Sequence, residues 1–164
     1  SNNQQLRSIA ARQEIWFILL IRIFNYGFRM IEVVAAVIEC DGKLLAFQRG
    51  PAKYEYIAHK YEFPGGKVET GENHRLALTR ELREELGLEA EVNDHVMTLE
   101  HAYPDFSIKM HCFLVHLDHF VGRLTEHKCF AHVSLNDAAE LDWIEADRPV
   151  LQRLKERFAD VFSG

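Results

Sequence analysis

The stretch from Gly66 to Leu88 constrains this 164-residue chain more than any other, because glycines and charged residues stand in it at fixed spacings. It reads GKVETGENHRLALTRELREELGL, that is, a glycine, five residues, Glu72, seven residues and then RELREELGL. Asn73 is a candidate N-cap, the residues that follow are good helix formers, and Gly87 stands where a left-handed C-cap is favourable. The pattern predicts a loop that leads into a helix.

Three glutamates of this stretch fall on one side of the expected helix. At 3.6 residues per turn, Glu81, Glu84 and Glu85 lie within an arc of roughly 100°. Like charges at this spacing repel by a few tenths of a kcal/mol per pair, so a cation close by is the natural partner. Carboxylate oxygens favour magnesium, with manganese as the alternative, over zinc. The other interpretation, a solvated acidic helix face, is disfavoured by the complete pattern around these glutamates.

The neighbours of the three glutamates suit such a site. Leu82 and Leu86 lie beside the acidic face and would anchor the helix to a core. Arg80 can pair with a glutamate and hold its orientation.

Composition limits the class of protein. The length suits one domain with a real core, and 48% apolar with 27% charged residues is typical of a soluble globular protein. A net charge of −6 argues against a nucleic-acid polymer as partner, although a small polyphosphate can still bind through local cations and a metal. Three widely spaced cysteines, none in a C-x-x-C pair, indicate reduced thiols in a cytoplasmic protein.

The chain divides into an N-terminal segment, residues 1–29, and a domain from 30 to 164. Met30 is a candidate original start, with the preceding segment then upstream or cloning-derived sequence. Periodic apolar residues predict a helix from Leu6 to about Phe24, which is expected to pack on the domain or to form a homodimer contact. A membrane surface is the remaining alternative, because the apolar run at 15–21 is too short for a membrane span.

The rest of the chain predicts strands around the central helix. The run at 32–39, the turn Asp41-Gly42 and the run at 43–49 form a strong hairpin signal. A short strand at 61–64 precedes the Gly65-Gly66 pair, two strands at 89–100 and 107–116 follow the central helix, and a short strand lies at 130–133. A short helix is expected from Ser134 to near Leu141, and a final helix, capped by Asp147, from Val150 to Phe162. This order indicates a mixed sheet between helices.

Other candidate residues are weaker on their own. Arg49 ends the second strand and could meet a phosphate, and Lys67, directly after the glycine pair, has the better claim. The histidine pairs His116/His119 and His127/His132 fit no strong zinc spacing and are interpreted as surface or ordinary core residues.

The pattern G-x5-E-x7-R-E-U-x-E-E-x-G-U, where U is aliphatic, is complete here and resembles the Nudix box of the Nudix hydrolase superfamily. The resemblance extends from residue 31 to about 154 and is greatest to MutT-like nucleoside triphosphate pyrophosphohydrolases, in particular the CTP pyrophosphohydrolase branch. It is carried by IEVVAAVI at 31–38, EFPGGKVE at 62–69 and ADRP at 146–149. It implies an α/β/α sandwich of the Nudix type with a mixed central sheet, to which the N-terminal helix would be an addition.

The resemblance also implies roles for single residues. Metal ligands, several of them also catalytic, would be Gly66 through its carbonyl, Glu81, Glu84, Glu85 and Glu126. Glu72 and Arg80 would support them, while Arg49 and Lys67 would face phosphates, Tyr103 would flank the nucleotide and Asp147 would read the base edge. MutT itself has an amide where this chain has Asp147. An acid accepts hydrogen bonds, as the cytosine amino group requires, which favours cytidine nucleotides.

The expected reaction is magnesium-dependent hydrolysis of a nucleoside triphosphate, (d)CTP or a modified nucleotide, to the monophosphate and pyrophosphate. A general base would be Glu84, Glu85 or Glu126. One alternative is a Nudix hydrolase of another diphosphate, such as 8-oxo-dGTP, a dinucleoside polyphosphate or ADP-ribose. The other is a nucleotide-binding sensor without catalysis, although such modules often lack box glutamates that this chain keeps.

Overall fold

A seven-stranded mixed sheet forms the centre of the computed structural model, which describes residues 30–163. The strand order is β3-β2-β1-β6-β5, and β4 also pairs with β1 and β7 with β2. The elements are β1 (Met30–Cys40), β2 (Lys43–Arg49), β3 (Tyr61–Glu62), β4 (Gly65–Lys67), α2 (His74–Leu86), β5 (Val92–Ala102), β6 (Ser107–Leu117), β7 (His127–Val133), α3 (Leu135–Ala138), the 3₁₀ helix η1 (Glu145–Asp147) and α4 (Arg148–Arg157).

Strand β1 organises the sheet. It pairs in parallel with β6 from Met30 opposite Ser107 to Cys40 opposite Leu117. On its other side it meets β2 in antiparallel register through a tight turn, in which Asp41 and Gly42 have φ of 51° and 73°. Both angles are those of the hairpin turn that an Asp-Gly pair favours, and the predicted hairpin is confirmed.

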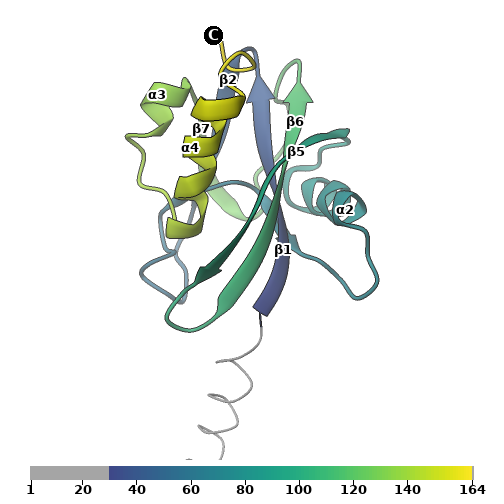
Figure 1. Ribbon diagram of the computed structural model, residues 1–164, viewed down its shortest axis with the longest axis vertical. Helices are drawn as coiled ribbons and strands as arrows, with labels where there is room; N and C mark the ends of the chain where they lie inside the picture. The colour runs from purple at the N-terminus through teal and green to yellow at the C-terminus, as the bar shows by residue number, and fades with distance from the viewer. Residues whose placement is uncertain (1–29, 164) are drawn as a thin grey trace, which may run out of the picture.

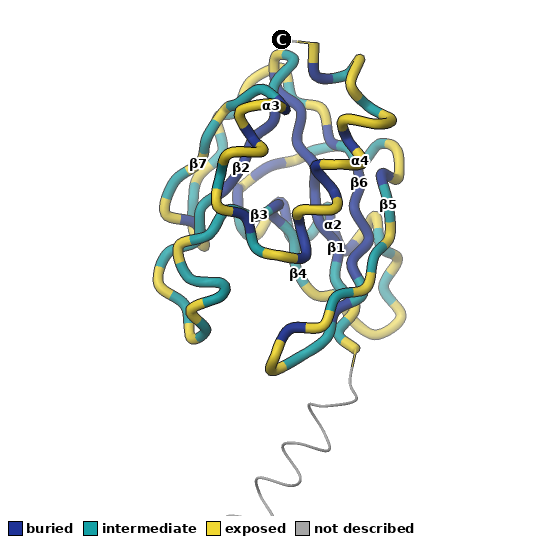
Figure 2. Tube along the Cα trace, turned by 60° about the vertical axis from the view of Figure 1, so that its left-hand side comes forward, coloured by how far each residue is buried: buried dark blue, intermediate teal, exposed yellow. Residues whose placement is uncertain are grey.

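Helices cover both faces of this sheet (Figure 1). Successive side chains of a strand point to opposite faces, so Val34, Ala36 and Ile38 of β1 pack with α2, whereas Ala35 and Val37 pack with α3 and α4. Figure 2 shows buried residues running through β1, β2 and β6, with exposed residues on the loops. The expected mixed sheet with helices is confirmed. The predicted N-terminal helix, Leu6 to Phe24, lies outside the described residues.

The central helix begins and ends as predicted. The Asn73 side chain accepts a hydrogen bond from Arg75 N, and Gly87, at φ 63°, donates its N–H to the carbonyls of Arg83 and Leu82. Four residues on one side are fully buried: Ala77, Leu78, Leu82 and Leu86.

The C-terminal helix differs from the prediction. α4 ends at Arg157 instead of Phe162, because Phe158 leaves the helical region at φ −132° and two turns follow. Phe162 is nevertheless buried, which explains why its apolar character extended the helical pattern. Asp147 makes no side-chain capping bond, because its carboxylate accepts a hydrogen bond from Phe63 N instead.

Smaller boundary shifts follow from pairing that the sequence pattern does not reveal. β4 is a strand where a loop was expected, since Gly66 and Gly65 pair with Val34 and Ala35 of β1. β5 begins at Val92 instead of Glu89, β7 begins at His127 instead of Phe130, and α3 ends at Ala138 instead of near Leu141. In the described part of the chain, no helix is long and apolar enough to cross a membrane.

Candidate active site

Helix α2 carries the predicted acidic residues at the edge of a buried face. Leu78, Leu82 and Leu86 fix the helix against the sheet, so the side chains of the opposite edge are held in place. Glu81 is nearly buried, with 13% of its side chain exposed, whereas Glu84 is 59% exposed. The three glutamates therefore sit in different environments on one helix.

Strand β4 brings the backbone of the glycine pair against this helix. A Cβ added at Gly66 would lie 2.5 Å from both carboxylate oxygens of Glu81, closer than nonbonded atoms allow. Gly65 is confined more strictly, because a Cβ there would clash with the backbone carbonyl of Val34. Only glycine permits this approach of strand and carboxylate.

Arg80 links the box loop to the helix. Its Nε and Nη2 donate to the two oxygens of Glu72 at 2.8 and 2.9 Å, and Nη2 also donates to the Lys67 carbonyl at 3.0 Å. Its Nη1 donates to Glu81 at 2.8 Å and to Glu84 at 3.4 Å. The bonds from Arg80 lower the pKa of Glu72 to about 2. The predicted pairing of Arg80 with glutamates is confirmed, and it is bidentate on Glu72.

Glu85 is the most perturbed carboxyl group of the site. Burial, together with nearby Glu62, Glu81 and Glu126, raises its pKa to about 8, against a lowering backbone hydrogen bond from Gly65. Its Oε2 is buried and has no hydrogen-bond partner among the described residues. A buried carboxyl group in such company lacks a positive partner, which a divalent cation would supply. The donor set therefore fits the expected metal.

Glu62 is a member of this cluster that sequence reasoning missed. Its two oxygens accept hydrogen bonds from Arg49 Nη1 at 3.2 Å each, and its Oε1 lies 2.9 Å from Nε2 of buried His127. The sequence did offer one signal for Glu62. It stands on a short strand just before the Gly65-Gly66 pair, where an acidic side chain faces either the glycine pair or solvent.

The loop before β7 closes the other side of the cluster. Thr125 donates from its hydroxyl to the Glu85 carbonyl at 2.7 Å and from its amide at 3.3 Å, which places the next residue, Glu126, close enough to raise the pKa of Glu85. Glu126 itself is exposed. Residues far apart in the sequence thus converge on one acidic cluster, which we define as Glu62, Glu81, Glu85 and Glu126.

The two residues predicted to meet the base, Asp147 and Tyr103, are both buried. Asp147 is 1% exposed, and its Oδ2 accepts a hydrogen bond from Phe63 N at 2.8 Å. Burial holds the pKa of Asp147 well above its usual range, which favours the neutral form of its carboxyl group. Tyr103 is buried, accepts a hydrogen bond from Ala146 N at 3.0 Å, and stacks on Tyr56 with ring centroids 5.4 Å apart. Contact with a base requires neighbouring side chains to move apart.

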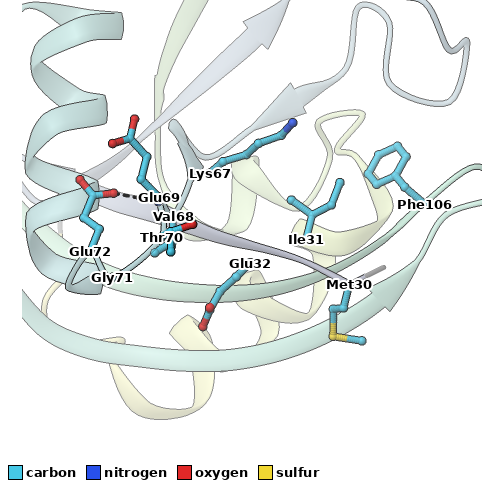
Figure 3. A pocket seen from close by; sticks show the side chains of 10 residues that line it. All are labelled: Met30, Ile31, Glu32, Lys67, Val68, Glu69, Thr70, Gly71, Glu72 and Phe106. Carbon is cyan, nitrogen blue, oxygen red and sulfur yellow. Dashed lines mark hydrogen bonds between the residues drawn. The ribbon is translucent and has the colours of Figure 1, made fainter. Parts of the chain in front are cut away.

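Lys67 directly follows Gly66 and lines a pocket of about 760 Å³. Figure 3 shows this pocket, with Lys67 reaching into open space and Glu69 and Glu72 on the neighbouring loop. The Glu69 amide donates to Glu72 at 3.0 Å, which shapes the loop before α2. The exposed ammonium group of Lys67 is free to meet an anionic ligand.

Comparisons with known proteins agree with this geometry. Residues 29–159 match the NUDIX domain. The chain is 44% identical over 126 residues to the CTP pyrophosphohydrolase of Escherichia coli (strain K12), an alignment that covers 76% of this chain and 90% of that protein. It is 35% identical over 119 residues to the putative 8-oxo-dGTP diphosphatase 2 of Mycobacterium tuberculosis (strain CDC 1551 / Oshkosh), covering 71% and 82%. The solution structure of the E. coli ORF135 protein matches with a TM-score of 0.71 at 39% identity, covering 84% of this chain and 97% of that one.

The matched domain and the hydrolase relatives identify this protein as a hydrolase, and the carboxylate-bearing helix fits the divalent metal that such enzymes generally need. The match over most of the chain then places it plainly: this protein belongs to the Nudix family.

Proposed function

We propose that this protein is a nucleoside triphosphate pyrophosphohydrolase that converts (d)CTP, or a modified nucleotide, to the monophosphate and pyrophosphate. The observation that carries the proposal is the buried, unpartnered carboxyl group of Glu85 among Glu62, Glu81 and Glu126. Such a cluster is a binding site for a cation that in turn binds a polyphosphate. The 44% identity to a CTP pyrophosphohydrolase supports the nucleotide class.

Magnesium is the proposed metal, with manganese as the alternative. Gly66, Glu81, Glu84, Glu85 and Glu126 would hold it, and all five offer the oxygen atoms that these hard cations prefer. When bound, the cation would neutralise phosphate charge and make a water molecule a better nucleophile. The approach of Gly66 to Glu81 supports a ligand role for this pair.

The other residues of the site would orient the substrate and take up a proton. Exposed Lys67 and half-buried Arg49 would bind phosphate oxygens, and Arg49 is already held in place by Glu62. Glu84, Glu85 and Glu126 are the candidate proton acceptors. Glu84 and Glu126 are exposed and reachable by the water that attacks, whereas Glu85 is mostly buried against the glycine pair. Separate Glu84→Gln and Glu126→Gln variants would show which of the two moves the acidic limb of the pH–rate profile.

Asp147 supports the choice of cytosine in a way that differs from the first expectation. The neutral form of its carboxyl group, which burial favours, offers one donor and one acceptor, and cytosine offers the complementary acceptor N3 and donor amino group. Oδ2 of Asp147 keeps a lone pair beyond the one that Phe63 N uses. An opening of the aromatic side chains around Tyr103 would then admit the base.

Hydrolysis of 8-oxo-dGTP is the second candidate, because the M. tuberculosis relative carries that name. Dinucleoside polyphosphates and ADP-ribose are further alternatives within the same class. A panel of CTP, dCTP, 5-methyl-dCTP, 8-oxo-dGTP, ADP-ribose and a diadenosine polyphosphate, assayed with magnesium, separates them by kcat/KM and products. Preference for cytidine triphosphates with release of pyrophosphate is the expected result. A preference for 8-oxo-dGTP would make that nucleotide, and not a cytidine triphosphate, the proposed substrate. Absence of turnover on the whole panel would contradict the proposal.

Asp147→Asn provides the matched test of base selection. An amide keeps the shape and one acceptor but places two donor hydrogens where the acid has one. We expect kcat/KM for dCTP to fall by about one to two orders of magnitude, as for loss of a buried polar contact to a substrate, with less effect on 8-oxo-dGTP. An unchanged ratio between the two substrates would remove Asp147 from base selection.

The remaining expectations concern the assembly and its setting. We propose that catalysis resides in the domain from 30 to 164, that the N-terminal segment contributes a homodimer contact, and that the protein works in the cytoplasm on a small nucleotide. Cys40, Cys112 and Cys129 are free, which agrees with a reducing compartment. Deletion of residues 1–29 should leave kcat unchanged and convert the dimer to a monomer, as measured by the mass of the particle in solution. An unchanged number of chains per particle would exclude the interface.

A further inference from the structure

A second group of metal-ligand side chains lies outside the acidic cluster, at the start of the same helix. It consists of Glu32 on β1, His74 as the first residue of α2, and His111 on β6. The parallel register places His111 beside Val34, two residues from Glu32 on the same face of the sheet. All three side chains therefore meet on the face that α2 covers.

The donor atoms of this group converge. Oε1 of Glu32 lies 2.9 Å from Nε2 of His74 and 2.9 Å from Nε2 of His111, and the three atoms all lie within 4.8 Å of one another. The two imidazole rings stack with centroids 3.9 Å apart and planes at 21°. Ligand atoms around a zinc ion are separated by roughly 3.3 Å when each lies about 2.0–2.1 Å from the metal. Small side-chain movements would therefore admit an ion.

A second layer of contacts orients the more buried imidazole. Nδ1 of His111 lies 2.9 Å from the Thr98 hydroxyl, which in turn lies 2.8 Å from Nε2 of His95. A hydroxyl group both donates and accepts, so it can accept from Nδ1–H when Nε2 is needed for a metal. A hydrogen bond to the far ring nitrogen is the usual companion of a metal-bound histidine.

We propose that Glu32, His74 and His111 form a binding site for a zinc-class transition-metal ion, separate from the magnesium site of the acidic cluster. Two imidazole nitrogens and one carboxylate oxygen are a donor set that favours zinc or its neighbours in the transition series over magnesium. The side chains of Glu32 and His74 are 46% and 36% exposed, and that of His111 is 10% exposed. The site is thus open to solvent on one side, where water would complete the coordination.

The position of this site gives the ion a structural role. It would fasten the first turn of α2 to β1 and β6, next to the loop of Glu69 to Glu72 that leads into the helix. Figure 3 shows Glu32 on the same pocket as that loop, with its carboxylate directed away from Lys67. Arg80 joins the same loop to the acidic cluster through Glu72 and Glu81. A metal ion at the second site would therefore restrain the loop and the first turn of α2 as well.

Titration of the full chain with zinc tests this inference. The protein is first stripped with a chelator and then titrated by calorimetry in millimolar magnesium, which occupies the acidic cluster, and cobalt is used in parallel for its visible spectrum. We expect one zinc ion per chain. His74→Gln and His111→Gln should each weaken zinc binding more than Thr98→Val, for which loss of an outer contact predicts roughly 10- to 100-fold.

Two control variants establish whether zinc binds at this group and nowhere else. His119→Gln alters an exposed histidine away from the group, and Glu85→Gln alters the acidic cluster; both should keep the zinc affinity of the unmodified chain. His74 is only half-buried and stands on the first turn of α2, so His74→Gln remains informative if His111→Gln does not fold. Zinc affinity that is unchanged in His74→Gln, or absent from the unmodified chain, would overturn the proposal. Neither result depends on which nucleotide the enzyme cleaves.

Discussion

Gly66 and Glu81 approach so closely that no side chain fits between them. A Cβ at Gly66 would lie 2.5 Å from each oxygen of the Glu81 carboxylate. The nearest atoms belong to the far end of a flexible side chain, so a larger residue would displace Glu81 without forcing the backbone apart. We predict that Gly66→Ala lowers kcat about 100-fold through this displacement, with little change in the free energy of unfolding.

Gly65→Ala is the matched contrast. A Cβ at Gly65 would clash with the Val34 carbonyl and lie 2.8 Å from its carbon, and backbone at the centre of β1 cannot move aside. We expect a loss of stability of about 1–3 kcal/mol or more. Urea unfolding of both variants, beside their kcat values, checks the pair. Equal destabilisation by the two substitutions would contradict the predicted displacement of Glu81 at Gly66.

The pKa of Glu85 predicts how the stability of the metal-free protein depends on pH. Burial and neighbouring carboxylates raise this pKa from 4.5 to about 8 on folding. Between these values the folded state holds a proton that the unfolded state has lost, so the free energy of unfolding falls as pH rises. The contribution is complete below about pH 4.5 and lost above about pH 8.

Comparison with Glu85→Gln isolates this effect. The difference in unfolding free energy between the two proteins, measured in EDTA from pH 4 to 9, should shift steadily in favour of the variant across that window. Magnesium should reduce the shift, because it replaces the proton as partner of the carboxylate. A difference that does not change with pH would show that Glu85 ionises normally.

Arg80 and Glu72 form the support of the box. A lysine cannot reproduce the paired bonds of the guanidinium group, so Arg80→Lys should release Glu72 and loosen Glu81. We predict that the pKa of Glu72 rises from about 2 toward 4.5 and that kcat falls at least tenfold. Carbon-detected NMR titration of the Glu72 carboxyl group measures the predicted change in its pKa. A Glu72 pKa that stays near 2 would mean that another group holds it.

Local rules were sufficient for most of the fold. The caps of α2 and the hairpin at Asp41-Gly42 each depend on neighbouring residues, and each was confirmed. The predicted end of α4 was wrong, because Phe162 is buried although it lies in a turn after the helix. β4 was missed for a similar reason: a Gly-Gly-Lys segment has no strand propensity and pairs only because β1 lies beside it.

The site was less accessible to such rules. Helical spacing predicted the proximity of Glu81 and Glu85, since both lie on one element. Glu62 joins them through sheet pairing, and Glu126 through a loop fixed by Thr125, and neither contact has a local signature. The raised pKa of Asp147 was also beyond prediction, because it depends on the burial of this side chain next to Phe63.

The acidic cluster around Glu85 is proposed to hold the cation used for hydrolysis. The decisive measurement is the kcat of Glu85→Gln on the preferred nucleoside triphosphate, with magnesium affinity and unfolding measured on the same sample. We predict a loss of at least three orders of magnitude in kcat, as for removal of a principal stabilising group, with weaker magnesium binding and an intact fold. Turnover close to that of the unmodified protein would contradict the claim.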